Sequence, residues 1–338
     1  MQNDWYKAHK TWRAILLMPL SWLFLSIANK RKILLHKNAY KSTIPIIIVG
    51  NITIGGTGKT PVVQAICNYL QQKGYHPAVI TRGFGGKTVH YPFVINENIS
   101  PNICGDEPFM LNKLLQTVPV VVSPKRSEAV EYIENQLTIV DVVISDDGLQ
   151  HYAMNRDIEI AVIDGERLFG NGLCLPAGPL REPIARLQTV DMIIVNGLGG
   201  GDIHIPNKTQ YNMQLLPQWL VNLKTGQRVG INEFIISKGK ACYGIAGIGN
   251  PKRFFRTIEN LGFSVDEHAF KDHHSFTIED FKAINDKKKT IIMTYKDAVK
   301  CQSFSKSNWY YLAILPEIEA DFFAVLSEKL SLCLERKK

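Results

Sequence analysis

The sequence predicts an α/β protein: a P-loop NTPase-like parallel sheet with helices on both faces. Three observations carry this prediction. A glycine-rich loop ends in Gly58-Lys59-Thr60, apolar strands alternate with helical segments, and charged residues stand at the ends of several strands. Strands that alternate with helices form parallel sheets, and such sheets bind ligands at the carboxyl ends of their strands. The prediction also includes a second, smaller α/β domain and an N-terminal membrane-associating helix.

Residues 1–41 are expected to form a membrane-anchor segment. They contain eight cations and one acid, Asp4, so they carry seven of the eight net positive charges of the chain. Residues 14–28 are uncharged, a run shorter than the roughly 18 residues of a confident membrane span. Trp5, Trp12 and Trp22 suit the membrane–water boundary. We therefore expect an interfacial helix with its cations on an anionic membrane surface.

Two alternatives remain open for this segment. A cleaved signal peptide also combines a basic start, an apolar run and small residues, here Ser26-Ile27-Ala28. A buried helix of a soluble core is the second alternative. A nucleic-acid partner is not expected, because basic residues would then surround the site rather than gather in one arm. The six cysteines form no Cys-x-x-Cys pair, so neither a zinc site nor a disulfide framework is predicted.

Residues 46–60 have the pattern of a phosphate-binding loop. An apolar strand over 46–50 enters the loop, and the helix that follows has Pro61 in its first turn and Gly74 after its end. Loop N–H groups and the helix dipole attract phosphate, Lys59 reaches the β- and γ-phosphates, and Thr60 holds Mg²⁺. The predicted nucleotide-binding residues are Thr53, Gly55, Gly56, Thr57, Gly58, Lys59 and Thr60. The sequence therefore predicts binding of ATP or GTP.

The loop is irregular, which keeps other functions open. Thr53 stands where the usual pattern has glycine, and the order Gly-Gly-x-Gly-Lys-Thr resembles the deviant loop of the ParA/MinD ATPases. Those proteins carry a signature lysine where this chain has Ile54. A membrane-associated ParA/MinD-like ATPase is therefore the first alternative function. A non-enzymatic GTP-binding scaffold is the second, although the chain has no Asn-Lys-x-Asp guanine signature.

The P-loop kinase core is predicted over 42–200. Its remaining strands are expected at 77–81, 118–122, 140–145, 158–163 and 191–195, and its other helices at 105–115 and 126–137. The strand over 140–145 ends at Asp146 and Asp147, which resemble Walker B acids near Mg²⁺ or else cap the next turn. Thr60, Asp146 and Asp147 form the predicted metal site. Lys59, Arg82, Asp106 and Asp146 are expected together at the carboxyl edge of the sheet.

The second half of the chain is predicted to hold a linker and a smaller domain. Residues 201–240 are expected to be a linker with short antiparallel strands over 210–236, and residues 241–338 a C-terminal α/β domain. In that domain the predicted strands are 241–245, 290–294 and 309–314, and the predicted helices are 251–261 and 320–335.

Two polar loops offer further candidates. Asp106 and Glu107 precede a helix, and Asp106 fits a helix N-cap as well as it fits a catalytic role. His273 and His274 are adjacent on a loop, with no third ligand spaced to complete a metal site.

A set of motifs resembles the tetraacyldisaccharide 4′-kinase family, the lipid A 4′-kinases. The motifs begin at Gly50, Thr81, Gly105, Ser145, Leu175, Ala246, Phe270 and Thr294, and together they run from the anchor to about residue 316. The resemblance implies transfer of the γ-phosphate of ATP, with Mg²⁺, to the 4′-hydroxyl of an acylated glucosamine disaccharide 1-phosphate. The product would be lipid IVA of lipid A biosynthesis, formed at the cytoplasmic face of the inner membrane. No oligomeric state is predicted.

The resemblance also implies roles for single residues. Asp106 would be the general base, paired with His273, and Lys59 would act on the transferred phosphate. Arg82, Glu107, Arg126 and Glu182 would be substrate-binding or supporting residues. The chain departs from the family pattern twice, because Phe84 replaces a more usual Tyr and Tyr295 replaces a usual Glu. Any role that the family assigns to the Tyr hydroxyl at position 84 or to the Glu carboxylate at position 295 is therefore in doubt for this chain.

Overall fold

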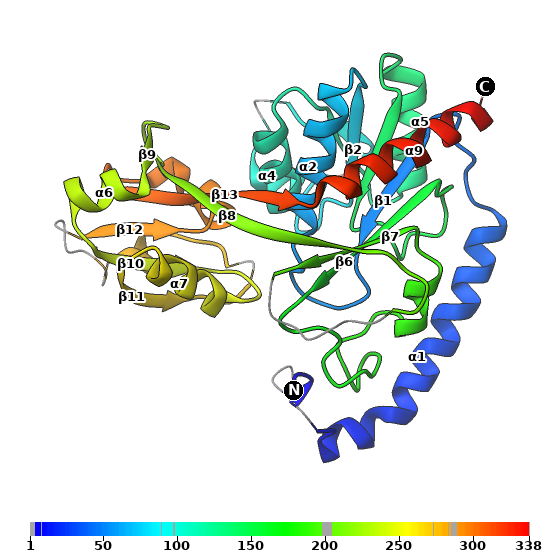
Figure 1. The fold of residues 1–338 in the computed structure, drawn as a ribbon, viewed down its shortest axis with the longest axis horizontal. Coiled ribbons are helices and arrows are strands. Elements are labelled where there is room, and N and C mark those ends of the chain that lie inside the picture. The colour runs from blue at the N-terminus through cyan, green and yellow to red at the C-terminus, as the bar shows by residue number, and fades with distance from the viewer. Residues whose placement is uncertain are drawn as a thin grey trace.

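Two lobes share one 13-stranded sheet (Figure 1). The structure is a computed structural model that describes residues 4–7, 9–88, 90–96, 99–197, 205–272, 274–282, 284 and 289–337. The strand order is β11-β10-β12-β13-β8-β7-β6-β1-β5-β2-β4-β3, with β9 paired to β8. The strands from β7 to β3 lie in the core lobe, and those from β11 to β12, with β9, lie in the second lobe.

The core lobe is built on parallel strands. They are β1 (Ile46–Gly50), β2 (Pro77–Thr81), β4 (Val120–Val122), β5 (Val142–Asp146), β6 (Ile158–Asp164) and β7 (Met192–Asn196), with β3 (Phe93–Val94) antiparallel at the edge. Successive β1 residues face opposite sides, since Ile47 joins one hydrophobic cluster and Ile48 the other. Helices α2 (Lys59–Gln72), α4 (Asp106–Leu115) and α9 (Ala320–Lys337) pack on the first face, and α5 (Arg126–Gln136) packs on the second. The predicted sheet with helices on both faces is confirmed.

The second lobe repeats this layering on a smaller scale. Its strands are β10 (Ala241–Ala246), β11 (Ser264–Ala269), β12 (Thr290–Met293) and the parallel-paired start of β13 (Trp309–Ile318). Helices α6 (Ile231–Lys238) and α7 (Pro251–Asn260) cover one face, and α8 (Tyr295–Cys301) with the short η3 (Ile278–Phe281) covers the other. The remaining short elements are α3 (Pro101–Cys104), η2 (Ile184–Gln188) and η4 (Gln302–Phe304).

Two long strands join the lobes. β8 (Gln210–Asn222) pairs in parallel with β7 near its start and antiparallel with β9 (Arg228–Gly230) near its end. β13 runs antiparallel to β8 along most of that length, with a register shift between Ala313 and Ile314. The expectation of short antiparallel strands over 210–236 was therefore wrong in two respects: 210–222 is one continuous strand, and 231–238 is a helix. Both strands are long because they are shared between two hydrophobic cores, a tertiary effect that local patterns do not reveal.

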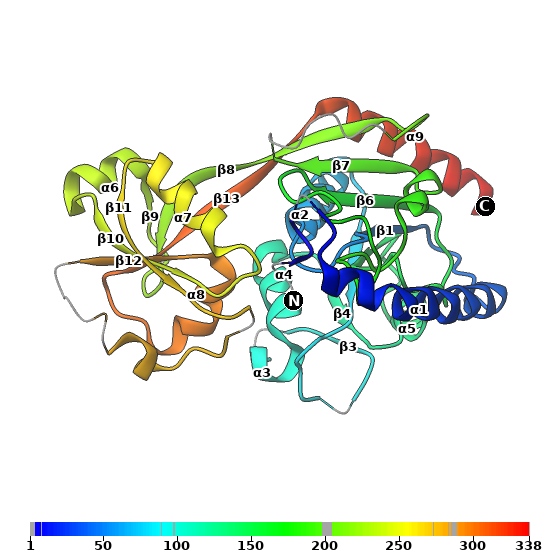
Figure 2. The ribbon, with the colours of Figure 1, turned by 90° about the horizontal axis from the view of Figure 1, so that it is seen from below.

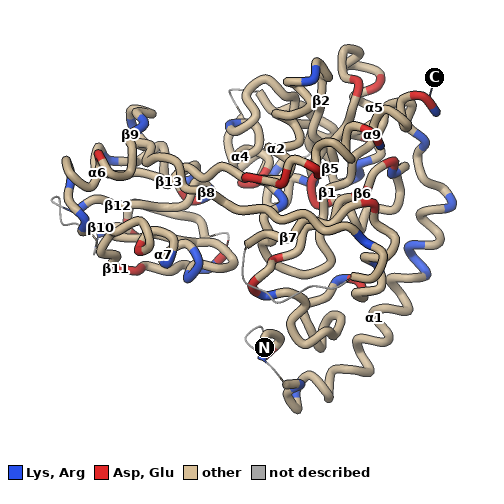
Figure 3. The backbone as a smooth tube through the Cα atoms, viewed as in Figure 1, with Lys and Arg blue, Asp and Glu red and all other residues tan. Residues whose placement is uncertain are grey.

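Helix α1 (Trp12–Lys37) runs along the side of the core lobe (Figures 1 and 2). Its exposed large apolar side chains are Trp12, Ile15, Leu16, Leu20, Trp22, Leu23, Ile27, Ile33 and Leu34. Within this helix only Ala14 and Ser21 are buried, and Ser21 Oγ donates to the Cys174 carbonyl at 2.7 Å. The alternative of a buried core helix is therefore wrong. By length and composition α1 is able to cross a membrane. Lys and Arg residues are spaced along this helix (Figure 3).

Candidate functional site

A cavity of about 1300 Å³ lies where the P-loop, the second lobe and helix α1 meet. It is lined by eleven of the predicted site residues: Gly55, Gly56, Gly58, Lys59, Thr60, Arg82, Glu107, Arg126, Asp146, Asp147 and Glu182. The second lobe contributes Asn250, Arg253 and Tyr295, among others, and α1 contributes apolar residues together with Arg31 and Lys32. The phosphate-binding loop and the exposed apolar helix α1 thus line the same cavity.

The P-loop takes the shape that its sequence predicts. Gly58 is the N-cap of α2 with a φ of 93°, a left-handed conformation that favours glycine. A Cβ at this position would lie 2.4 Å from Asn196 Nδ2, so glycine is required for space as well. Asn196 Nδ2 donates to the Thr57 carbonyl at 3.0 Å, and the same side chain accepts from Arg253 Nη2 at 3.1 Å. The end of β7 therefore supports the loop and links it to the second lobe.

Asp146 and Asp147 stand at the carboxyl end of β5, beside the start of the P-loop. The parallel register pairs Val49 of β1 with Asp146, which explains this placement. Asp146 is the last residue of the strand and is 3% exposed. Asp147 has a φ of 50° and turns its carboxylate toward Lys59 Nζ, 3.4 Å away, and Arg181 Nη1, 3.0 Å away. The two neighbouring carboxylates thus lie in very different surroundings.

Those surroundings move the two pKa values in opposite directions. Burial, with Glu107 adding to it, raises the pKa of Asp146 to about 7, against the opposing effect of Lys59. Burial also acts to raise the pKa of Asp147, but Lys59 and Arg181 outweigh it and hold that pKa below its ordinary value. Asp147 is therefore a permanent anion, whereas Asp146 needs a cation beside it to stay ionised at neutral pH.

Basic groups form another wall of the cavity. Arg126 is 3% exposed and donates to the Asp146 carbonyl, and burial lowers its pKa to about 10. Burial, together with Arg126 and Arg82, lowers the pKa of His151 to about 3, so this imidazole is neutral at physiological pH. His151 was not among the predicted site residues, although it closes the motif that begins at Ser145.

Asp106 begins helix α4, on the core-lobe side of the contact with α8. Gly105 is the N-cap of that helix and makes no side-chain cap hydrogen bond, so the N-cap alternative for Asp106 is wrong. Asp106 Oδ2 lies 3.1 Å from Lys300 Nζ, and Glu107 Oε1 lies 3.7 Å from Lys296 Nζ. Residue 273, the predicted partner of Asp106, lies outside the residues that the structure describes.

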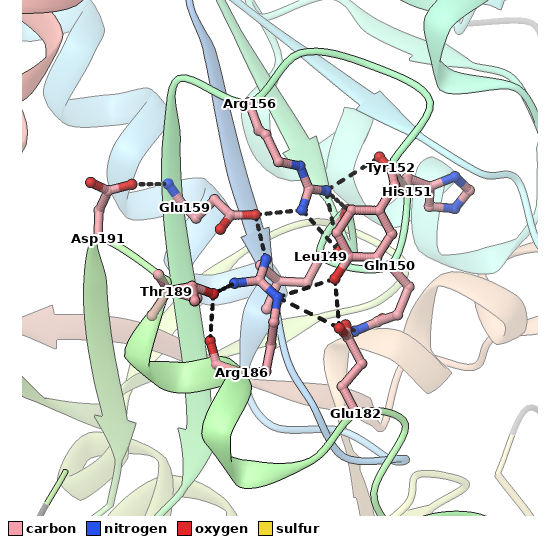
Figure 4. A network of polar contacts seen from close by, with 12 residues as sticks. Leu149, Gln150, His151, Tyr152, Arg156, Glu159, Glu182, Arg186, Thr189 and Asp191 are labelled. Carbon is pink, nitrogen blue, oxygen red and sulfur yellow. Dashed lines mark hydrogen bonds and ion pairs between the residues drawn. The ribbon is translucent and has the colours of Figure 1, made fainter. Parts of the chain in front are cut away.

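Glu182 belongs to a polar network that connects α1 to the P-loop side of the cavity (Figure 4). Its carboxylate accepts from Gln150 Nε2 at 2.8 Å and from the Tyr152 hydroxyl, and lies 3.5 Å from Arg186 Nε. Lys32 of α1 reaches the same carboxylate at 4.0 Å. Glu182 is therefore held in place by several neighbours from different segments.

The network extends in both directions from Glu182. Gln150 Oε1 accepts from Arg181 Nη1 at 3.2 Å, which joins Glu182 to the Asp147–Lys59 pair. On the other side Arg186 Nη2 binds Glu159 Oε1 at 2.6 Å (Figure 4). Tyr152, Glu159 and Arg186 are buried and the other groups are partly buried, so each depends on its partners to offset the cost of leaving water.

The other predicted residues have structural surroundings of their own. Thr53 is buried and accepts from Asn51 Nδ2 at 3.4 Å, and neither Thr53 nor Thr57 is among the cavity-lining residues. Phe84 lines the cavity rim and is 68% exposed. Tyr295 packs against Tyr311 with ring centroids 4.7 Å apart and the ring planes tilted by 54°, so an aromatic ring lines the cavity where the family pattern has an acid.

The oxygen atoms beside Lys59 suit a magnesium ion. Among the described residues Asp146 Oδ1 is buried and has no hydrogen-bond partner, a costly arrangement for a carboxylate that nothing neutralises. Mg²⁺ binds one or two carboxylates together with substrate phosphates and water. The donor set therefore fits this ion, and its charge would also offset the burial that raises the pKa of Asp146.

Several contributors to the cavity were missed by the sequence analysis. They are His151, Gln150, Arg181, Asn196 and Arg253; Lys300, which pairs with Asp106, was also missed but is not among the cavity-lining residues. Gln150, His151, Arg181 and Arg253 lie within motifs that had been singled out, which was the available signal. Asn196 and Lys300 are outside those motifs, and only their contacts in three dimensions bring them to attention.

The glycine-rich loop on a parallel sheet, with its lysine paired to a strand-end acid, places the chain in the class of P-loop nucleotide-binding proteins. The family model for tetraacyldisaccharide-1-P 4′-kinase matches residues 13–331. The chain belongs to this kinase family.

Individual relatives agree with that assignment. The tetraacyldisaccharide 4′-kinase of Francisella philomiragia is 46% identical over 324 residues, which cover 94% of this chain and 99% of that protein. Its counterpart in Francisella tularensis subsp. novicida is 47% identical over 323 residues, with the same coverage of both chains. A crystal structure of LpxK from Aquifex aeolicus in complex with ATP has a TM-score of 0.75 and 27% identity, and the match covers 95% of this chain and 99% of that one.

The opposite pKa shifts of the adjacent acids predict opposite effects on stability. The pKa of Asp146 is higher in the folded chain, so its ionised form weakens folding above about pH 7, and this penalty fades as the pH falls. In metal-free protein, Asp146→Asn should raise the unfolding temperature at about pH 8, lose most of this advantage by about pH 5 and lose the rest near about pH 4. The free energy of unfolding should rise by at most about 4 kcal/mol, because the pKa of Asp146 is raised by about three units on folding.

Asp147→Asn is the matched control. The pKa of Asp147 is lowered, so its carboxylate stabilises the fold above the ordinary pKa and its loss should lower the unfolding temperature at both pH values. Thermal unfolding of both variants with a chelator present checks the pair. Destabilisation of the Asp146→Asn variant at alkaline pH would contradict the assignment of a buried, uncompensated carboxylate.

Proposed function

We propose that this protein transfers the γ-phosphate of ATP to the 4′-hydroxyl of a tetraacyldisaccharide 1-phosphate, forming lipid IVA in lipid A biosynthesis. The observation that carries the proposal is the shared cavity. Its P-loop side offers Lys59 and backbone N–H groups to a nucleotide, and its α1 side offers apolar and basic groups to a lipid. A phosphoglycolipid with acyl chains matches such a mixture of surfaces. The names of the relatives and the ATP complex of the Aquifex protein support the same activity.

The cavity residues are proposed to supply binding and charge neutralisation. Phosphoryl transfer depends on positioning and on stabilising negative charge, and it needs little covalent chemistry from the protein. Lys59 would bind the β- and γ-phosphates, while the loop glycines and the α2 N-terminus would hold the same group through backbone N–H donors. Thr60, Asp146 and Asp147 would hold Mg²⁺, which supplies further neutralisation of phosphate charge when bound. Arg82 and Arg126 are proposed to add positive charge near the reacting groups.

Asp106 is proposed to accept the proton of the 4′-hydroxyl. A sugar hydroxyl becomes an effective nucleophile only as its proton is removed, and a carboxylate within reach is able to do this. His273 is the proposed partner that holds Asp106 and shares the proton, so that the two titrate as one unit. Glu107 and Glu182 are proposed supporting groups, Glu107 through Lys296 and Glu182 through the Gln150–Tyr152 network.

The membrane is the proposed working surface. An apolar helix with exposed tryptophans and neighbouring cations suits the headgroup boundary of an anionic membrane. The nucleotide is supplied from the cytosol, so we place the protein at the cytoplasmic face of the inner membrane. We keep 1–41 as the anchor, 42–200 as the kinase core, 201–240 as the linker and 241–338 as the C-terminal domain within this proposal, with two exceptions in packing: α6 covers the second lobe and α9 packs on the core lobe.

Phosphate transfer to lipid is the direct test. Purified protein with labelled ATP and a tetraacyldisaccharide 1-phosphate acceptor should yield a new phosphorylated lipid, one per ATP consumed. Lys59→Ala should abolish this product while the fold remains intact, because Lys59 neutralises charge on the transferred phosphate. A ParA/MinD-like ATPase would instead hydrolyse ATP slowly without labelling the lipid. That outcome, or full activity of a folded Lys59→Ala variant, would refute the proposed function.

Asp106→Asn tests the proposed base. Asparagine keeps the shape of the side chain but cannot accept the proton, so kcat should fall by about 10²–10⁴-fold while ATP binding changes little. His273→Ala should lower kcat within the same range, and the double variant should be little worse than the worse single variant. Steady-state kinetics of the three variants give the comparison. Near-normal turnover of Asp106→Asn would exclude the base role, and multiplicative losses would indicate two separate roles.

Deletion of residues 1–40 tests the anchor. The truncated protein should no longer sediment with anionic vesicles, because the exposed apolar face and six net positive charges are removed together. For the intact chain, added salt should weaken but not abolish binding, since salt screens charges and leaves apolar contact unaffected. Equal sedimentation of both proteins would show that the membrane contact lies elsewhere.

A further inference from the structure

Lys300 connects the second lobe to the proposed base. It lies near the end of α8, and its Nζ is 3.1 Å from Asp106 Oδ2 in the core lobe. The same ammonium donates to the His274 carbonyl at 3.0 Å and lies 5.9 Å from the centre of the Phe276 ring. The contact therefore joins α8, the loop before η3 and the first turn of α4.

The burial of this lysine distinguishes it from the other lysines. Its side chain is 7% exposed, whereas Lys7 and Lys125, in ion pairs within one local segment, are 50% and 76% exposed. A lysine is almost never fully buried without a partner, and holding its four-carbon chain in one arrangement costs conformational entropy. Such a cost is met only where the charge is well paired. The Lys300–Asp106 ion pair is therefore a specific contact of the fold and not a chance pairing of surface charges.

We propose that Lys300 is a positioning residue for the general base. By taking Oδ2, its ammonium sets the rotation of the Asp106 carboxyl group and favours the ionised form that is able to accept a proton. The inference rests on the proposed function, in which Asp106 is that base. It adds that the base is complete only when the second lobe brings α8 to α4.

Charged and titratable groups from other segments also face this region, and the test has to take them into account. They are Glu107 on α4, Cys104 on α3, Lys296 on α8, and Asp272 and His274 on the loop before η3. Lys296 is paired with Asp272 at 3.1 Å and with Glu107 at 3.7 Å. Lys300 is thus the cation of α8 for which an ion pair with Asp106 is observed, and removing it changes the field at that carboxylate most directly.

The pH dependence of turnover is the readout. An opposite charge nearby lowers the pKa of a carboxyl group by about 1–3 units, so Lys300→Met should move the acid limb of the kcat/KM profile to higher pH by about that amount. The loss should then be greatest below the shifted limb and shrink as the pH rises above it, while the KM for ATP stays nearly constant. Lys300→Arg should keep the wild-type limb, because the positive charge remains.

Two further variants make the test decisive. Lys300→Gln retains a donor for the His274 carbonyl without the charge, and it should shift the acid limb as Lys300→Met does, even if the methionine variant folds poorly. Lys337→Met is the matched control. It removes another poorly exposed lysine, 3.2 Å from Asp157 and not among the residues that line the cavity, and should leave the profile unshifted.

A constant fold-loss at every pH in both neutral variants, or wild-type kinetics, would overturn the role of Lys300. Failure of the proposed function is distinguishable, because the Asp106→Asn variant would then keep its activity. If Asp106→Asn is inactive while the acid limb of the Lys300 variants does not move, only the positioning role is wrong.

Discussion

Parallel pairing of β1 with β5 is the constraint on which the candidate site depends. It sets Val49, at the entrance of the P-loop, beside Asp146, the last residue of the neighbouring strand. Parallel strands end at the same edge of a sheet, so the loop and the acids that follow these strands must share that edge. Slipping the register by one residue would bring a side chain to the place of Gly50, where a Cβ would lie 2.7 Å from Leu149 Cγ. The packing of the core thus fixes the geometry of the site.

The same edge concentrates charges that are unstable unless they are paired. Asp147 is held between Lys59 and Arg181, and Arg181 is shared with Gln150. Through Glu182 these contacts reach Lys32 of α1. A chain of hydrogen bonds and ion pairs therefore runs from the P-loop to the apolar helix. Asp146 differs, because its burial is compensated by a bound cation in the proposed complex. Asp147 is thus fixed by protein partners before the proposed cation binds, whereas Asp146 depends on that cation.

The sequence was sufficient for the features that depend on local pattern. Alternating strands and helices, the glycine-rich loop before α2 and the acids at the end of β5 were all predicted from residue order. Features that depend on partners distant in the chain were not. Asn196 supports the P-loop from 139 positions away, and Asp106 was equally compatible with an N-cap until Gly105 was seen in that place.

The middle of the chain shows the same limit. The length of β8 was missed because its residues alternate poorly between buried and exposed, the consequence of serving two cores. No local window contains that information. The exposure of α1, by contrast, was expected from its sequence, and the structure adds that Leu25 packs against the core while most of its large apolar side chains are exposed.

The two strands that join the lobes behave mechanically as a ribbon. Hydrogen bonds between β8 and β13 tie Met213 to Ile318 and Asn222 to Tyr310, so the strands resist sliding and stretching along their length. A ribbon of two strands is much softer to bending out of its plane, and its register shift at Ala313 lies where Leu215, Trp219 and Leu315 face the cavity. A ligand that touches both lobes therefore has only to bend the β8–β13 ribbon out of its plane. The resistance of the two strands to sliding and stretching keeps the lobes aligned with each other.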